Sequence, residues 1–200
     1  MLLTIILLSH NNDKNLFEII KNFSLYSPNC NLLIADSGKE RKNILESIKT
    51  DYKIKIIFNE NHGIYTSLNN TLKKLGTEYY LVLGLDDILD FNVLNKFIIS
   101  LEKNKVDLLF AGVIKSGKKL LFLKTNKKNI LNGPAGTFPS HTGGVAIRKD
   151  LHSKFGDYSL DFKVISDLFF ISSCLLGNCS SKLYEDYLSN IGAKGFSKKN

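Results

Sequence analysis

Two adjacent carboxylates, Asp86 and Asp87, follow an apolar run, YYLVLG, at residues 79–84. Their negative charges repel each other, and an ordinary turn does not require both of them. A divalent cation between the carboxylates and a phosphate-bearing ligand removes this repulsion, because Mg²⁺ and Mn²⁺ accept carboxylate, phosphate and water oxygens. The pair therefore favours a site for Mn²⁺ or Mg²⁺ at the end of a buried strand.

A simpler role for Asp86 or Asp87 is to cap the following helix, as aspartate often does. A cap needs only one carboxylate, however, and Asp90 stands closer to the expected helix start. The metal site is therefore the favoured interpretation, and capping is the alternative.

Three other polar clusters also follow apolar runs. They are Ser9-His10-Asn11, Asp36-Ser37-Gly38 and the residues from Asn59 to Gly63. If the preceding runs are parallel strands of one sheet, their carboxyl ends meet at a single edge, which is where such sheets bind ligands. Four polar clusters, each directly after an apolar strand, thus predict a binding site at that edge.

Alternating strands and helices are expected to position these clusters. The apolar runs 2–8, 31–36, 53–58 and 79–84 read as strands. Between them, helical spacing of apolar residues predicts a helix that begins near Asp13, a second that contains residues 44–48 and a third over 64–75. This alternation is typical of a mostly parallel sheet with helices on both faces, and so of an α/β fold.

The pattern changes after a helix expected at 91–103. Strands are predicted at 106–113, 118–124, 145–148 and 182–188, with a turn over 115–118 and a helix near 167–177. This half resembles a mixed or antiparallel sheet. We therefore expect residues 1–200 to form a single domain in two sections, 1–105 and 106–200.

Composition excludes several classes of protein. The chain has 200 residues, of which 44% are hydrophobic and 23% charged, as expected for a globular domain rather than a disordered one. The net charge is +8, and lysines cluster at 115–119, 124–128 and 194–199. These clusters either solvate the surface or attract anions such as the headgroups of a membrane. Aromatic residues do not alternate with them, so nucleic acid is not an expected partner.

The first residues and the cysteines indicate the compartment. The opening run MLLTIILL is too short to span a bilayer and lacks a basic leader, so it is expected to be a buried strand. The three cysteines, Cys30, Cys174 and Cys179, form no CxxC pair and are expected to be core thiols. A cytoplasmic location follows, with peripheral contact at the inner face of the cell membrane as an option for the lysines.

Four segments, in this order, resemble blocks of the family-2 glycosyltransferases. They are TIILLSHNN, LLIADSGKE, GIYTSLNNTLKKLGTEYYLVLGLDDIL and HTGGVAIRKDLHSKFGDYSLDFKVISDLFF, and the resemblance extends over about residues 3–197. It implies the GT-A (nucleotide-diphospho-sugar transferase) fold and transfer of a sugar, with inversion, from a nucleotide sugar to a hydroxyl group. Residues 1–105 would then bind the donor and 106–200 the acceptor.

The resemblance also implies roles for individual residues. The donor-binding residues would be Ser9, His10, Asn11, Asp36, Gly63, Asn69 and Asp86, with Asp36 on the nucleobase. Asp87 and Asp86 would hold Mn²⁺ or Mg²⁺ on the diphosphate, and Asp167 would be the catalytic base. His141, Gly143 and Gly144 would contact the acceptor or the phosphates.

Each of these residues also has a plain structural interpretation. Asp36 precedes Ser-Gly, as turn aspartates do, and Asp167 suits the first turn of a helix because of the helix dipole. His141 is a single loop histidine, and Gly143 with Gly144 is consistent with a turn. Thr66-Ser67, Gly84-Leu85 and Thr142 depart from residues that are common in the family, so the donor sugar and the acceptor stay open.

The resemblance suggests a UDP-, GDP- or dTDP-sugar donor and a glycan or lipid-linked acceptor in bacterial surface polysaccharide or lipid-linked oligosaccharide synthesis. One alternative is a sugar-nucleotide nucleotidyltransferase, but these enzymes usually have a glycine-rich basic loop after the first strand, and LSHNNDKN contains no glycine. A second alternative is a non-catalytic module that binds nucleotide sugar or nucleic acid.

Overall fold

The computed structural model describes residues 1–9, 13–26, 28–36, 53–59, 63–120 and 141–192. The strands are β1 (Leu3–Ser9), β2 (Asn31–Asp36), β3 (Ile54–Phe58), β4 (Tyr79–Gly84), β5 (Ile88–Leu89), β6 (Leu108–Lys115), β7 (Lys118–Leu120), β8 (Val145–Arg148) and β9 (Ser181–Ile191). The helices are α1 (Asp13–Tyr26), α3 (Ile64–Leu72), α4 (Phe91–Asn104), α6 (Leu151–Phe155) and α7 (Ser166–Leu176), with a 3-10 turn, η3 (Thr142–Gly144).

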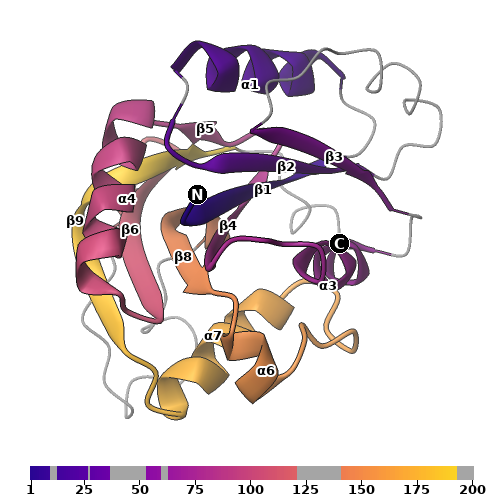
Figure 1. Ribbon diagram of the computed structural model, residues 1–200, viewed down its shortest axis with the longest axis vertical. Helices are drawn as coiled ribbons and strands as arrows, with labels where there is room; N and C mark the ends of the chain where they lie inside the picture. Colours follow the sequence, from indigo (N-terminus) through magenta and orange to yellow (C-terminus); the bar gives the residue numbers. More distant parts are fainter. Residues whose placement is uncertain (10–12, 27, 37–52, 60–62, 121–140, 193–200) are drawn as a thin grey trace.

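The strands form one curved sheet in the order β3-β2-β1-β4-β8-β6-β9-β5, with β7 paired to β6 (Figure 1). The first four strands in this order are parallel to one another. β8 is antiparallel to both β4 and β6, whereas β9 is parallel to β6 and antiparallel to β5. The predicted α/β fold, with a parallel section followed by a mixed one, is therefore confirmed.

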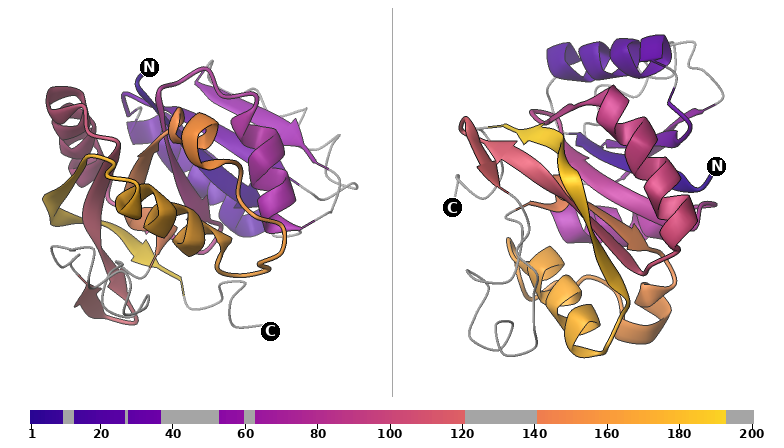
Figure 2. Two further views of the ribbon diagram at one scale, coloured as in Figure 1. Left: turned by 90° about the horizontal axis from the view of Figure 1, so that it is seen from below. Right: turned by 90° about the vertical axis from the view of Figure 1, so that its left-hand side faces the viewer.

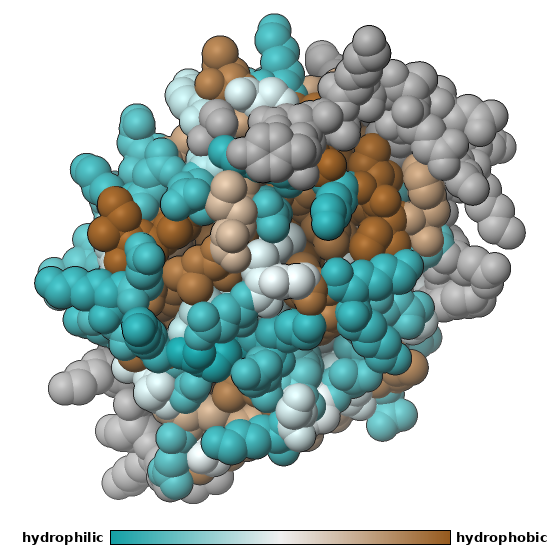
Figure 3. All heavy atoms as spheres, viewed as in Figure 1, coloured by the Kyte–Doolittle hydropathy of each residue, from teal (hydrophilic) through white to brown (hydrophobic). Residues whose placement is uncertain are grey.

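Helices cover both faces of the sheet. Successive side chains of a strand point to opposite faces, so Ile5 and Leu7 of β1 pack in the cluster that contains α1 and α4. Ile6 packs in the cluster that contains α3, α6 and α7. Figure 2 shows α1 and α4 on one side of the sheet and α6 and α7 on the other. The outer surface seen in Figure 3 is largely hydrophilic, with apolar side chains between the polar ones.

Most predicted elements match the structure within a few residues. Asp90 is the N-cap of α4, since its carboxylate accepts hydrogen bonds from the backbone N–H groups of Asn92 and Val93. Ser116 and Gly117 have positive φ angles of 50° and 74°, which is typical of a two-residue hairpin turn and confirms the turn between β6 and β7. The short elements β5 and α6 were not predicted.

Some predictions fall outside the described residues. These include the helix that contains residues 44–48, residues 121–124 of the strand predicted at 118–124, most of the loop before η3, and the lysine clusters at 124–128 and 194–199. Cys30 and Cys174 are buried and Cys179 is half-buried, and all three are free thiols, as predicted. No helix in the described ranges is long and apolar enough to cross a membrane.

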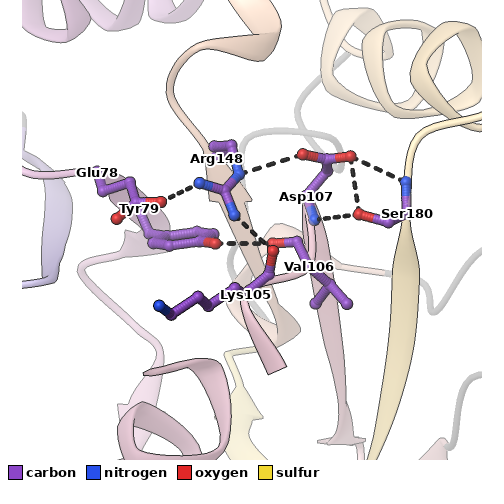
Figure 4. A network of polar contacts seen from close by, with 7 residues as sticks. All are labelled: Glu78, Tyr79, Lys105, Val106, Asp107, Arg148 and Ser180. Carbon is purple, nitrogen blue, oxygen red and sulfur yellow. Dashed lines mark hydrogen bonds and ion pairs between the residues drawn. The ribbon is translucent and has the colours of Figure 1, made fainter. Parts of the chain in front are cut away.

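A polar network joins the two sections of the sheet at the amino ends of β4 and β6 (Figure 4). Arg148, at the end of β8, forms ion pairs with Glu78 and with Asp107, where its Nε lies 3.1 Å from Oδ1. Its guanidinium carbon lies 4.7 Å from the ring centre of Tyr79. The other oxygen of Asp107 accepts hydrogen bonds from the N–H and Oγ–H of Ser180. This network lies away from the strand ends that carry the predicted site.

Candidate functional site

At the carboxyl edge of the parallel strands, the structure brings Ser9 and Asp36 close together, next to the end of β4. Ser9 is paired in register with Asp36, and Leu8 with Gly84. Ser9 and Asp36 are both buried. The backbone of Asn59, just after β3, donates to the carbonyl of Asp36 at 2.8 Å. His10 and Asn11 lie outside the described residues.

Asp87 is held by the backbone of Gly84, the last residue of β4, and of Gly192, which directly follows β9. Its Oδ2 accepts from the N–H of Gly84 at 2.9 Å, and its Oδ1 accepts from the N–H of Gly192 at 3.0 Å. Burial raises the pKa of the Asp87 carboxyl, and the nearby Asp86 carboxyl acts in the same direction, while His141 and the two N–H donors oppose the rise. Each carboxylate oxygen keeps a further lone pair, so the fixed side chain can still accept a cation.

Asp86 lies against the backbone at two glycines. A Cβ at Gly192 would lie 2.2 Å from Oδ2 of Asp86, and a Cβ at Gly84 would lie 3.1 Å from Oδ1. Because glycine has no Cβ, Gly84 and Gly192 both leave room for the half-buried Asp86 side chain. Gly192 was not identified from the sequence, because no local pattern links residue 192 to residue 86.

His141 completes this group from the other side. Its Nδ1 lies 3.9 Å from Oδ2 of Asp87 and accepts a hydrogen bond from the N–H of Gly143. In the described part of the chain, no three His, Cys, Asp or Glu side chains form a cage for a metal. Asp86 and Asp87 nevertheless fit Mg²⁺ or Mn²⁺, because such ions use one or two carboxylates and take their remaining ligands from phosphate and water.

Gly143 and Gly144 form a turn that packs against the sheet. The hydroxyl of Ser189 donates to the carbonyl of Gly143 at 2.7 Å. A Cβ at Gly144 would lie 2.7 Å from Val113 and 2.8 Å from the carbonyl oxygen of Ala111. The close approach that these glycines allow is thus to strands of the same chain, and a contact with acceptor or phosphate stays a prediction.

Asp167 lies in the first turn of α7, as predicted. Its Oδ1 accepts a hydrogen bond of 2.8 Å from the hydroxyl of Tyr65, in the first turn of α3. α3 begins after Gly63, which has a φ of 96°, and follows the carboxyl end of β3, so Asp167 contacts the start of the helix that comes after that strand. Within the described residues, no hydrogen bond or ion pair joins Asp167 directly to Asp87.

Asn69 of α3 makes contacts that the sequence did not indicate. Its Nδ2 donates to the carbonyl of Tyr158 at 2.9 Å, and its Oδ1 accepts from the N–H of the same residue at 3.0 Å. The side chain is buried, so both ends of the amide serve to hold the segment before α7. Donor binding by Asn69 stays a prediction.

A cavity of about 830 Å³ opens beside Asp86 and Asp87. It lies between α1 and residues 85–92, and its floor is formed by apolar strand residues such as Leu7 and Leu83. Neither Asp36 nor Asp167 lines it. Asp86 and Asp87 therefore border this cavity, whereas Ser9, Asp36 and Asp167 do not.

The fold is similar to those of several solved structures. TarS from S. aureus in complex with UDP-GlcNAc is 16% identical with a TM-score of 0.74, over 98% of this chain and 59% of that chain. The mannosyltransferase PcManGT from Pyrobaculum calidifontis in complex with GDP-Man and Mn²⁺ is 14% identical with a TM-score of 0.70, over 98% and 59%. A CMP:2-keto-3-deoxy-manno-octonic acid synthetase complexed with CTP is 9% identical with a TM-score of 0.63, over 100% and 95%. At these identities the likeness establishes a common fold.

The chain spans about 60% of the length of the TarS and PcManGT chains. No curated protein matches it. The profile of glycosyl transferase family 2 matches residues 4–169, which include Asp36, the Asp86-Asp87 pair and Asp167, whereas Gly192 lies beyond the match. The fold is that of the GT-A transferases, and the chain belongs to glycosyl transferase family 2.

Proposed function

We propose that the protein transfers a sugar, with inversion, from a nucleotide sugar to a hydroxyl acceptor with the help of Mn²⁺ or Mg²⁺. The observation that carries the proposal is the fixed position of Asp87, which two backbone N–H groups hold at the tip of β4 with Asp86 beside it. Family membership supports it, as do structural neighbours that bind UDP-GlcNAc, or GDP-Man together with Mn²⁺.

On the donor side, Asp36 would bind the nucleobase and Ser9 would line the nucleoside pocket. The register of β1 and β2 places the two residues side by side. Asp86 and Asp87 would hold the metal ion, which when bound stabilises the negative charge of the departing nucleoside diphosphate. The two N–H donors to Asp87 orient its carboxylate before any ligand arrives, so little reorganisation is needed on binding.

On the acceptor side, Asp167 would take the proton from the attacking hydroxyl group. A carboxylate within hydrogen-bonding reach of that group suits this task. Inversion needs a single displacement and one base, by the same logic as in inverting glycoside hydrolysis. His141 would contact the phosphates or the acceptor, and its position 3.9 Å from Asp87 supports this role.

The remaining assignments are finer proposals of the same account. The donor would be a UDP-, GDP- or dTDP-sugar and the acceptor a glycan or lipid-linked saccharide of bacterial surface polysaccharide synthesis. Residues 1–105 would bind the donor and 106–200 the acceptor. The reaction would take place in the cytoplasm or at the inner face of the membrane.

A nucleotidyltransferase is the second candidate, because the CMP:2-keto-3-deoxy-manno-octonic acid synthetase shares the fold over 95% of its own length. The products separate the two reactions. Purified protein is incubated with UDP-, GDP- and dTDP-sugars and with CTP plus a sugar acid, each with and without Mn²⁺. The proposal predicts metal-dependent release of a nucleoside diphosphate, whereas release of pyrophosphate would support the second candidate.

A further inference from the structure

The hydroxyl group of Tyr65 lies at the beginning of α7, 102 residues away along the chain from Asp167. It contacts both Oδ1 of Asp167 and the carbonyl oxygen of Val164 at 2.8 Å. Only 8% of the Tyr65 surface is exposed. In the described part of the chain, Oδ2 of Asp167 accepts no hydrogen bond, so Tyr65 binds one carboxylate oxygen and leaves the other available.

The same hydroxyl group meets the uncapped start of α7. Ile165 occupies the N-cap position and provides no side-chain hydrogen bond, so the first N–H groups of the helix lack their usual partner. The backbone N–H groups of Ser166 and Asp167 act on the Tyr65 oxygen and lower the pKa of its phenol. Burial and the charge of Asp167 outweigh this effect and raise the pKa well above 10, so the phenol stays protonated and remains a donor at neutral pH.

Tyr65 is itself held in place by a buried cluster. Its ring packs 5.7 Å from the ring of Tyr158, whose backbone is bound by Asn69, one turn further along α3. The hydroxyl of Tyr158 is 2.7 Å from that of Tyr80 in β4, which in turn contacts His152. The position of the Tyr65 hydroxyl is therefore fixed by α3 and by the segment between α6 and α7, which Tyr158 ties to β4 and Asn69 ties to α3.

We propose that Tyr65 is a positioning residue for the transfer reaction. It holds Oδ1 of Asp167 and the first turn of α7 together, and so directs Oδ2 toward the hydroxyl group that is to lose its proton. This inference rests on the proposed role of Asp167 as the base. A base that is free to rotate spends less time within hydrogen-bonding reach of its substrate, and such misplacement lowers the rate of the chemical step more than the binding of the donor.

The test compares Tyr65→Phe with Tyr79→Phe. Both remove one tyrosine hydroxyl from a buried side chain, but the hydroxyl of Tyr79 donates to the carbonyl of Val106, in the network at the amino end of β4. We expect Tyr65→Phe to lower kcat by about tenfold or more while the donor Kd and KM stay within about twofold of wild type. Tyr79→Phe should keep the wild-type kcat. Equal kcat in Tyr65→Phe and wild type, or an equal loss in both variants, would overturn the proposal.

A second substitution covers the case in which Tyr65→Phe does not fold. Replacement of Tyr65 by 3,5-difluorotyrosine keeps the shape of the ring but lets the phenol ionise at lower pH. The phenolate cannot donate to Asp167. As the pH is raised, kcat of this variant should therefore begin to fall at a pH several tenths of a unit or more below the pH at which the wild-type kcat falls. Superimposable pH profiles would contradict the positioning role.

Asp167→Asn separates this inference from the proposed function. If Asp167→Asn retains the wild-type kcat, Asp167 is not the base and the proposed mechanism fails. If Asp167→Asn is inactive and Tyr65→Phe is as fast as wild type, only the role of Tyr65 fails.

Discussion

The backbone N–H of Gly192, the residue that directly follows β9, donates a hydrogen bond to Oδ1 of Asp87, 105 residues earlier in the chain. Asp86 lies against the same glycine. The two carboxylates are thus held between the tip of β4 and the tip of β9. The end of β9 is therefore part of the candidate site, although it lies beyond the residues that match the family profile.

Gly192→Ala should weaken donor binding. Its Cβ would lie 2.2 Å from Oδ2 of Asp86, so the carboxylate or the end of β9 must move. We expect the donor Kd in the presence of Mn²⁺ to rise about tenfold, which corresponds to about 1.4 kcal/mol. The control is Gly76→Ala, because a Cβ at Gly76 meets no atom within 4 Å. Calorimetric titration measures both, and an unchanged Kd for Gly192→Ala would show that the packing of Asp86 does not matter for the donor.

Asn69→Ala should destabilise the fold. The substitution leaves the N–H and C=O of Tyr158 buried without their partners, at a cost of about 1–3 kcal/mol for each group left unsatisfied. The neighbouring Asn70 is exposed and provides the matched control, Asn70→Ala. Urea unfolding compares the two variants. If Asn69→Ala is as stable as wild type but loses donor affinity, Asn69 binds the donor, as the sequence predicts.

His152 should make the stability of the protein depend on pH. Burial lowers its pKa below the ordinary value of 6.5, although the carbonyl of Gly156 and the charge of Asp157 oppose this. In the unfolded chain the imidazole takes up a proton as the pH falls below 6.5, whereas in the folded protein it resists protonation. The unfolded state therefore binds more protons, and folding stability falls as the pH falls through this range.

The measurement is urea unfolding at several pH values between about 7 and 5. His152→Phe keeps a ring that can stack on Phe170, whose centre lies 4.2 Å away, but it cannot take up a proton. Its stability should change less with pH than that of wild type. His141→Gln is the control, because it also removes one histidine but leaves His152 in place. If the stability of His152→Phe depends on pH as steeply as that of wild type, the assignment to His152 is refuted.

Local patterns in the sequence were sufficient to predict most of the described elements in the first half of the fold. The strands 31–36 and 79–84 were predicted with the bounds that the structure has, because apolar runs between turn residues depend on neighbours in sequence. Asp90 as the cap of α4 follows from the same local chemistry. The alternation of strands and helices then determined which ends share an edge.

The contacts that organise the site could not be predicted in this way. Tyr65 with Asp167 and Gly192 with Asp87 each join residues more than 100 positions apart. Such pairs depend on how α7 and β9 pack on the first section, which no local period encodes. β5 escaped prediction for a related reason: it has two residues and exists because it pairs with β9.

The central claim is that Asp86 and Asp87 bind the donor through a divalent cation. The most direct test is calorimetric titration, with and without Mn²⁺, of the nucleotide sugar that supports diphosphate release. It is carried out on wild type, Asp86→Asn, Asp87→Asn and Asp167→Asn. We predict that Mn²⁺ tightens donor binding in wild type and in Asp167→Asn, and that both other variants lose this gain. The same gain from Mn²⁺ in Asp86→Asn and Asp87→Asn as in wild type would contradict the claim.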